Sequence, residues 1–199
     1  IIIQTVRALA PSFGGINLED IAAPRCFDIE DALQDLGIPV FHDDQHGTAI
    51  AVLAGVMNAL LVTGRKIEDT KFVFAGAGAG GIASTKLLME QGATHVTLVD
   101  STGIIHKDRS DLTAVKSAML ETTNPDNTQG GIAEAMRGAD VFIGLSAADA
   151  VTAEMVSSMA KDSIVFAMAN PIPEIWPDEA RAAGAAVVGT GRSDFPNQI

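Results

Sequence analysis

The sequence predicts an α/β fold built on a doubly wound parallel sheet. Apolar segments of strand length alternate with segments of helix length along most of the chain, as a parallel sheet requires, because a crossover must join each strand to the next. These strand segments are continuously apolar, which is typical of strands buried on both faces. A glycine-rich stretch links one strand directly to a helix and completes a βαβ unit over residues 71–100.

Apolar runs, capping residues and glycine stops place the elements in chain order. We expect a short helix with Asp28 as its N-cap and Gly37 as its stop, and a long apolar helix closed by Gly64. Pro177 suits the first turn of the last helix. The expected strands are 13–18, 38–42, 71–75, 95–100, 140–146, 163–168 and 186–189, and the other helices are 48–63, from the glycine stretch to 91, 111–120, 132–137 and 152–159, with a loop at 122–130.

Composition excludes several classes of protein. The chain has 199 residues, of which 47% are hydrophobic, so it can form one domain with an appended piece. Its net charge of −12 argues against nucleic acid or anionic membranes as partners, since both need clustered Lys and Arg. The single cysteine, Cys26, permits no internal disulfide and fits a reducing compartment. We find no signal peptide and no unbroken apolar run of about 18 residues, and therefore expect a cytoplasmic protein.

The glycine stretch has the spacing Gly76-x-Gly78-x-x-Gly81 between an apolar strand and a helix. In Rossmann-like domains the first glycine permits a tight turn, the second admits a pyrophosphate, and the third lets the helix pack on the strand. Asp100 ends the next strand, where a carboxylate can accept hydrogen bonds from a ribose diol. The alternative is glycines that serve close packing alone. We expect a dinucleotide to bind at Gly76, Ala77, Gly78, Ala79, Gly80, Gly81 and Asp100.

The sequence leaves the choice between NAD and NADP open. Asp100 would repel a 2′-phosphate, whereas Lys107 and Arg109, a few residues later, would attract one. The alternative for these two side chains is that they are solvated loop charges. A second pair of glycines, Gly189 and Gly191, has no helix signal after it and is a weak motif.

Eight acidic residues fall between residues 19 and 44. Four of them, Asp28, Glu30, Asp31 and Asp35, suit a solvated face of the short helix. The pairs Glu19-Asp20 and Asp43-Asp44 instead follow apolar runs.

If those two runs are neighbouring parallel strands, the acidic pairs meet at the edge of the sheet where such folds bind ligands, and their oxygens suit Mg²⁺ or Mn²⁺. For Asp43-Asp44 alone, the alternative is to lie at the N-terminus of the following helix. No Cys/His set has zinc spacing. His42 and His46 are interpreted as structural groups or as partners of ligands rather than as ligands. A metal beside a dinucleotide suits oxidation of a hydroxy acid, because the metal acidifies the hydroxyl and can hold an enolate.

Four motifs resemble those of the malic enzymes, specifically the shorter bacterial type. They are Gly14-Gly-Ile-Asn-Leu-Glu-Asp20, Phe41-His-Asp-Asp-Gln-His-Gly-Thr48, Phe166-Ala-Met-Ala-Asn-Pro171 and Gly191-Arg-Ser-Asp-Phe-Pro-Asn197. The resemblance spans nearly the whole chain in order. It implies oxidative decarboxylation of malate to pyruvate and CO₂, with reduction of NAD or NADP, a requirement for Mg²⁺ or Mn²⁺, and a homodimer in the full-length protein.

The resemblance also implies roles for individual residues. Glu19, Asp20 and Asp44 would be metal ligands, and Asp43 an accessory carboxylate near the proton-transfer site. Asn170 would contact the nicotinamide end or the substrate; without the resemblance, it is interpreted as a strand-end cap.

The family's general acid and base, a tyrosine and a lysine, precede the first of these motifs. This chain has no tyrosine and no lysine before Lys66. We therefore expect residues 1–40 to link from a further N-terminal domain, residues 41–199 to form an NAD(P)-binding domain with an incomplete C-terminal end, and the chain alone to turn over malate poorly or not at all. The alternatives are a malolactic-type enzyme, a non-catalytic dinucleotide-binding module and a metal-free amino-acid dehydrogenase, the last of which leaves the acidic pairs unexplained.

Overall fold

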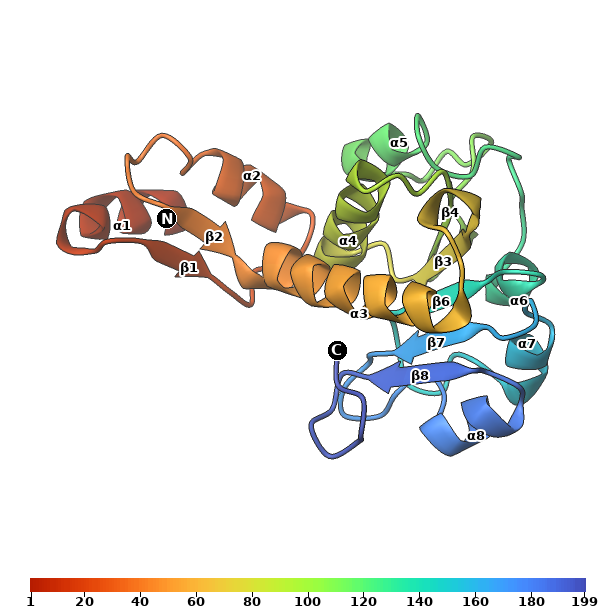
Figure 1. The fold of residues 1–199 in the computed structure, drawn as a ribbon. Coiled ribbons are helices and arrows are strands. Elements are labelled where there is room, and N and C mark those ends of the chain that lie inside the picture. The colour runs from red at the N-terminus through yellow and green to blue at the C-terminus, as the bar shows by residue number, and fades with distance from the viewer.

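A six-stranded sheet forms the centre of the larger of two lobes in the computed structural model, which describes all 199 residues (Figure 1). The strand order is β5-β4-β3-β6-β7-β8, and every neighbouring pair is parallel except β4 with β5. This is the doubly wound order, in which successive strands are added on one side of β3 and then on its other side, so the strand order reverses between β3 and β6. The strands are β3 Lys71–Ala75, β4 His95–Asp100, β5 Gly103–Ile104, β6 Val141–Gly144, β7 Ile164–Ala167 and β8 Val187–Thr190.

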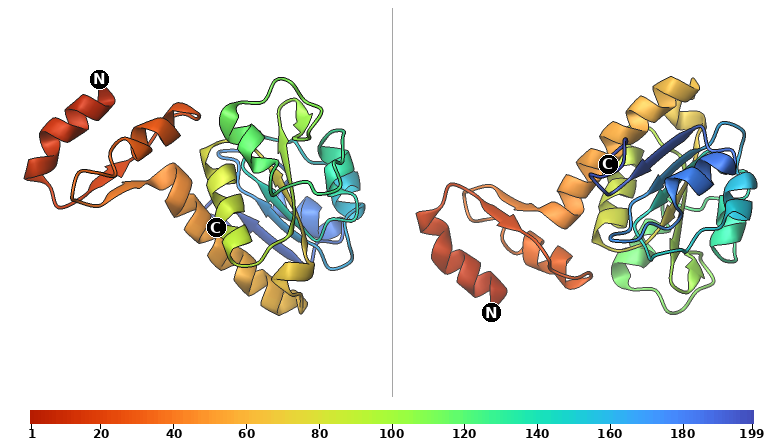
Figure 2. Two further views of the ribbon diagram at one scale, coloured as in Figure 1. Left: turned by 90° about the horizontal axis from the view of Figure 1, so that it is seen from above. Right: turned by 90° about the horizontal axis from the view of Figure 1, so that it is seen from below.

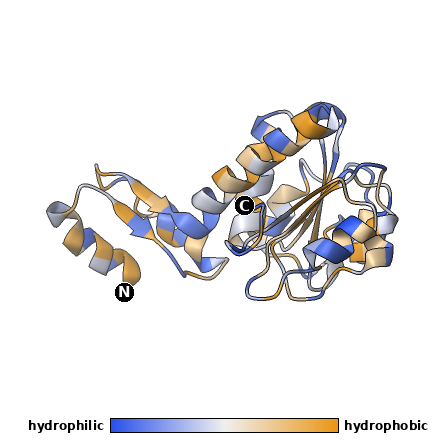
Figure 3. Cartoon of the chain, turned by 60° about the horizontal axis from the view of Figure 1, so that its bottom comes forward, coloured by the Kyte–Doolittle hydropathy of each residue, from blue (hydrophilic) through white to orange (hydrophobic).

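Helices cover both faces of this sheet because successive side chains of each strand point to opposite faces. Phe72 and Phe74 belong to a core formed with α3 and α4, whereas Val73 and Ala75 belong to a second core on the other face. Figure 3 shows the hydrophobic colouring along the central strands. The helices of this lobe are α3 Thr48–Thr63, α4 Ala79–Glu90, α5 Ala114–Met119, α6 Ile132–Met136, α7 Ala153–Ser157 and α8 Pro177–Ala182, with a 3₁₀ turn at Ile67–Asp69.

The small N-terminal lobe stands apart from the six-stranded sheet in every ribbon view (Figures 1 and 2). Its two strands pair in parallel, with Leu18 opposite His42. Its one hydrophobic cluster contains only three buried residues, Leu18, Ile29 and Leu33, and Ala10 and Cys26 are its other buried apolar residues. The elements of this lobe are α1 Ile2–Leu9, a 3₁₀ turn at Ala10–Ser12, β1 Ile16–Leu18, α2 Arg25–Asp31 and β2 Val40–His42. A π-helical turn, Asp43–Gly47, then leads into α3.

Helix α3 joins the two lobes and is strongly apolar. Together with the turn before it, the stretch Asp43–Thr63 is long and apolar enough to cross a membrane by length and composition, although Gly55 and Asn58 interrupt its apolar run. Val52, Val56, Ala59 and Leu60 of this helix nevertheless lie in the core beside the sheet, as in a core helix. Its other side exposes apolar groups, with Leu61 79% and Val62 76% exposed.

The parallel sheet and most of the expected elements are confirmed, including α3 at 48–63 with Gly64 in the left-handed conformation after it. The short acidic helix is placed wrongly: it begins at Arg25 with Pro24 as N-cap and ends at Asp31. Residues 32–35 form turns and residues 36–38 form a bend instead. The two-residue strand β5 was not expected, because so short an edge strand has no periodicity of its own.

Candidate functional site

The glycine loop joins β3 to α4 as expected, and its glycines differ in what surrounds them. Gly76 has a φ of +111°, and a Cβ there would collide with the carbonyl of Leu145. A Cβ on Gly81 would collide with the carbonyl of Gly76. Around Gly78 there is no atom within 4 Å of the Cβ position. Two glycines therefore serve the turn and helix packing, and Gly78 leaves room for a ligand to reach the backbone.

Helix α4 directs its first amide groups at this open space. Ile82 N–H is the first amide of α4 to donate within the helix, to Gly78 O at 3.0 Å, so the amides of Ala79, Gly80 and Gly81 have no intrahelical acceptor. Such amides, with the positive end of the helix dipole, bind phosphate groups. A Cβ on Gly80 would lie 3.1 Å from the carbonyl oxygen of Asp44. The glycine loop thus packs directly against the acidic turn.

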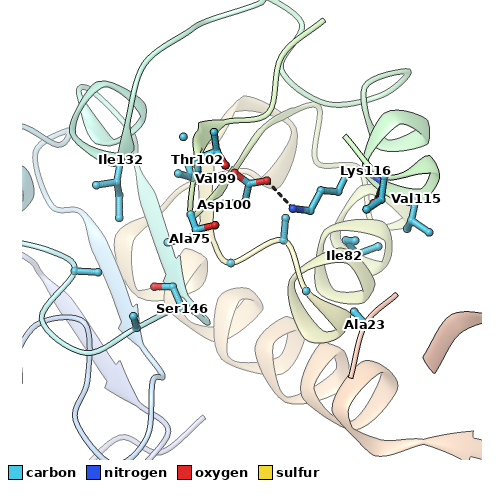
Figure 4. A pocket seen from close by; sticks show the side chains of 18 of the residues that line it. Ala23, Ala75, Ile82, Val99, Asp100, Thr102, Val115, Lys116, Ile132 and Ser146 are labelled. Carbon is cyan, nitrogen blue, oxygen red and sulfur yellow. Dashed lines mark hydrogen bonds and ion pairs between the residues drawn. The ribbon is translucent and has the colours of Figure 1, made fainter. Parts of the chain in front are cut away.

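A cavity of about 680 Å³ opens beside the loop (Figure 4). Gly76, Ala77 and Gly78 line it, and Asp100 lies at the end of β4 across from them. The loop before α2 contributes Ala23 and the adjoining residues, so both lobes enclose this space. Its volume lies within the range of small-molecule and cofactor sites.

Two cations hold the carboxylate of Asp100. Arg109 donates to its two oxygens at 2.8 and 3.1 Å, and Lys116 Nζ donates at 2.6 Å; the Lys116 contact is drawn in Figure 4. The Asp100 side chain is only 7% exposed. Burial by itself would raise the pKa of Asp100, but the hydrogen bonds from Arg109 and Lys116 outweigh it and lower the pKa to about 2.

Arg109 is therefore not a solvated loop charge, because its side chain is 8% exposed and also pairs with Asp111 at 2.6 Å. Asp111, then Asp100, raise the pKa of this arginine. Lys107 is exposed, as one of the two expectations had it. Sequence reasoning missed Lys116, which lines the cavity. No local pattern marks it, because the packing of α5 over the end of β4 brings it to Asp100.

The two acidic pairs lie at the carboxyl ends of adjacent parallel strands, as expected. Asp20 N–H donates to Asp44 Oδ2 at 2.8 Å, and Glu19 accepts a hydrogen bond of 3.5 Å from Asn17. The side chains of Glu19, Asp20 and Asp43 are exposed. The donors are all oxygens, as Mg²⁺ prefers. The structure nevertheless has no group of three or more Asp, Glu, His or Cys side chains arranged to hold a metal ion.

The π-helical turn Asp43–Gly47 carries the second acidic pair. Neither aspartate is the N-cap of α3, which is Gly47 without a side-chain hydrogen bond, but both lie in the first turn of the helical stretch that runs into α3, as the alternative interpretation of this pair had it. The carboxylate of Asp43 lies over Gly47, where a Cβ would collide with it. The side chain of the buried Gln45 instead forms a hydrogen bond with α2.

The prediction that Glu30 of α2 lies on a solvated helix face is wrong. Glu30 is 7% exposed rather than solvated. Gln45 donates to it at 2.8 Å and His46 Nε2 lies 2.7 Å from its other oxygen. Glu30 thus fixes the turn that bears Asp43 and Asp44. His42 is fully buried, and neither of its ring nitrogens has a hydrogen-bond partner.

Asn170 follows β7 at the same edge of the sheet as the glycine loop. It precedes a cis peptide bond to Pro171, is exposed, and does not line the 680 Å³ cavity. The structure therefore places it near the carboxyl ends of the strands without bringing it into that cavity.

Comparison with known proteins identifies the family. The model of the malic enzyme NAD-binding domain matches residues 45–196. A bifunctional malic/malolactic enzyme of Bacillus subtilis is 55% identical over all of this chain and 49% of its own length. An NADP-dependent malic enzyme of Haemophilus influenzae is 48% identical over all of this chain and 26% of its own length. The crystal structure of an NAD-dependent malic enzyme from Thermotoga maritima superposes with a TM-score of 0.97, at 46% identity, over 100% of this chain and 53% of that one.

The chain spans about half the length of the Bacillus and Thermotoga relatives and about a quarter of the Haemophilus relative. The part that it contains is the NAD-binding domain. The glycine loop, the buried aspartate at the end of β4 and the doubly wound sheet agree with that match. The chain belongs to the malic enzyme family, of which it carries the NAD(P)-binding domain.

Proposed function

We propose that this chain provides the dinucleotide-binding and cation-binding parts of a site that oxidatively decarboxylates malate. One observation carries the proposal: Gly80 of the phosphate-binding helix packs against the backbone of Asp44. A dinucleotide bound along the glycine loop would therefore end close to the acidic pairs. A hydroxy acid held by those groups would lie within reach of the nicotinamide.

The chain's own residues bind and orient the dinucleotide. The amides of Ala79 to Gly81 receive its phosphates, and Asp100 accepts hydrogen bonds from its adenosine ribose. The bound nicotinamide supplies the hydride acceptor. Asp100 stays ionised at neutral pH because its pKa is about 2. Its oxygens already accept from Thr102 N–H, Arg109 and Lys116, so a ribose hydroxyl would share or replace one of these donors.

We also propose that Asp44, Asp20 and Glu19 bind Mg²⁺ or Mn²⁺. Support comes from the hydrogen bond that joins Asp44 to the backbone of Asp20 and from the all-oxygen character of the set. When bound, the cation would polarise the substrate hydroxyl and stabilise an enolate. Asp43, on the same turn, is proposed as an accessory carboxylate, and Asn170 as a contact for the nicotinamide end or the substrate.

Calorimetric titration of the 199-residue chain with Mn²⁺ tests the cation site. Asp44→Asn should weaken Mn²⁺ binding by about a hundredfold or more, since it removes one charged ligand. Asp28→Asn is the matched control, because Asp28 is an exposed acid on α2 and belongs to neither pair. Equal Mn²⁺ affinities for the wild type and Asp44→Asn would leave the acidic pairs without a cation role.

A malolactic activity is the second candidate, because the Bacillus relative is named a bifunctional malic/malolactic enzyme. Incubation of the full-length protein with malate, NAD⁺ and Mn²⁺ separates the two. Pyruvate with equimolar NADH supports the malic activity, whereas lactate without net NADH supports the malolactic one. Formation of neither pyruvate nor lactate would contradict both candidates. The isolated chain should give neither, because the tyrosine and lysine of the family's proton transfers are absent from it.

A further inference from the structure

Glu174 is a fully buried acid that the proposed chemistry does not use. It is 0% exposed, and no Lys, Arg or His forms an ion pair with it. A buried carboxyl group without a cation is costly unless hydrogen bonds compensate. The burial of this carboxyl group in the loop after β7 therefore needs a structural or functional explanation.

The carboxyl group joins two loops by hydrogen bonds to their backbones. Its Oε1 accepts from Ser146 N at 2.8 Å and from Ser146 Oγ at 3.0 Å. Its Oε2 accepts from Ala169 N at 3.0 Å. Ser146 follows β6 and Ala169 follows β7, so one side chain links the carboxyl ends of two neighbouring strands.

Gly144, the last residue of β6, leaves the space that the carboxyl group fills. A Cβ at Gly144 would lie 2.6 Å from each oxygen of Glu174. The φ of Gly144 is not positive, so its glycine is explained by this close approach rather than by backbone conformation. The two positions therefore fit together as one local arrangement.

Both linked loops belong to the dinucleotide edge of the sheet. Ser146 lines the cavity opposite Asp100 (Figure 4), and Ala169 is followed directly by Asn170. Asp100 at the end of β4 holds the adenosine half in a fold of this type, so the other half of the dinucleotide extends across the switch point toward β6 and β7.

We propose that Glu174 is a positioning residue for the nicotinamide half of the dinucleotide. It acts through Ser146 and Ala169, which it holds at a fixed separation with both of its oxygens acting as acceptors. This proposal rests on the dinucleotide site described above. It concerns the affinity for the nicotinamide half of the dinucleotide only.

Glu174→Gln tests the proposal, because the amide keeps the size of the side chain but turns one acceptor into a donor facing a backbone N–H. The affinities of the chain for NAD⁺ and for ADP-ribose, which lacks the nicotinamide, are measured by calorimetry. We expect NAD⁺ to bind about tenfold more weakly or worse, the loss of one hydrogen bond to a charged group. ADP-ribose should change by less than about twofold.

The two ligands distinguish positioning from a general effect on folding. Glu179→Gln, an exposed glutamate on α8, is the matched control and should leave both affinities unchanged. Equal weakening of NAD⁺ and ADP-ribose by Glu174→Gln, or no change in either, overturns the inference. A wild-type chain that binds neither ligand would instead contradict the dinucleotide site itself.

Circular dichroism would reveal whether Glu174→Gln folds. If it does not, Ser146→Ala tests the proposal. This variant removes one of the three hydrogen bonds and should weaken NAD⁺ binding more than ADP-ribose binding. If both variants fold, their effects on NAD⁺ affinity should be less than additive, as expected for residues that share an interaction. Additive effects would contradict the link between the two residues.

Discussion

Replacing Asp100 by Asn should weaken NADH binding and shift the preference of the site toward NADPH. The carboxylate would no longer accept two hydrogen bonds from the adenosine ribose, and the loss of a hydrogen bond to a charged group costs roughly 1.5–3 kcal/mol. We therefore expect the Kd for NADH to rise by about 10- to 100-fold. Lys116 and Arg109 would lose their shared counter-ion and become available to a 2′-phosphate.

The same substitution should lower the free energy of unfolding at neutral pH. The pKa of Asp100 falls from 3.8 to about 2, and each unit corresponds to about 1.4 kcal/mol. The side chain is 7% exposed, so solvent screening is small. The expected loss is roughly 2 kcal/mol, measured by urea denaturation at pH 7.

Titration of protein fluorescence with NADH and NADPH measures the ratio of the two affinities. Asp178→Asn is the control, because Asp178 is also an ion-paired aspartate, with Arg181, but is exposed and does not line the cavity. It should leave the ratio unchanged. An unaltered NADH-to-NADPH ratio in Asp100→Asn would refute the assignment of Asp100 and its two cations to cofactor discrimination.

Three further perturbations follow from the structure. The stability difference between wild type and Asp100→Asn should be complete above the unfolded pKa near 3.8 and should vanish as the pH falls through the folded pKa of about 2; urea denaturation from pH 7 to pH 2 checks this, and a constant difference would contradict it. Gly78→Ala should fold but bind dinucleotide at least about tenfold more weakly, and normal binding in calorimetry would contradict the pyrophosphate position at Gly78. Gly81→Ala should instead unfold at a lower temperature in thermal melting, because its Cβ meets a backbone carbonyl. Glu30→Ala should lower the free energy of unfolding by about 1–3 kcal/mol, because two donors lose their acceptor. Asp31→Ala, at an exposed neighbouring residue, should lower it by less than about 0.5 kcal/mol. Equal losses for the two variants in urea denaturation would show that the buried hydrogen bonds contribute little.

Local signals predicted the framework of the fold and the dinucleotide loop. The long apolar run ended by Gly64 predicted α3 because a left-handed glycine commonly ends a helix, and the structure confirms both bounds. The parallel pairing of β1 with β2 was suggested by two apolar runs that each end in an acidic pair, and the structure has that pairing. Such features need only neighbouring residues for their recognition.

Interactions between distant segments could not be predicted in this way. Glu30 has the composition of a solvated helix face, and only the packing of α2 against the π-helical turn buries it. Lys116 lies 16 residues from its partner Asp100, on a helix with no pattern that marks a binding site. Glu174 gave no signal either, because its partners follow two other strands.

The small core of the N-terminal lobe has a consequence for how tightly a cation is held. With a hydrophobic cluster of only three buried residues and two strands of three residues each, the lobe should open locally at a lower free energy than the six-stranded sheet. Glu19 and Asp20 lie in this lobe, so a cation that binds only the closed lobe would shift its opening equilibrium. Amide hydrogen exchange of β1 should then slow as Mn²⁺ is added, while exchange of β3 stays constant, and the apparent Mn²⁺ affinity is the intrinsic affinity multiplied by the closed fraction of the lobe.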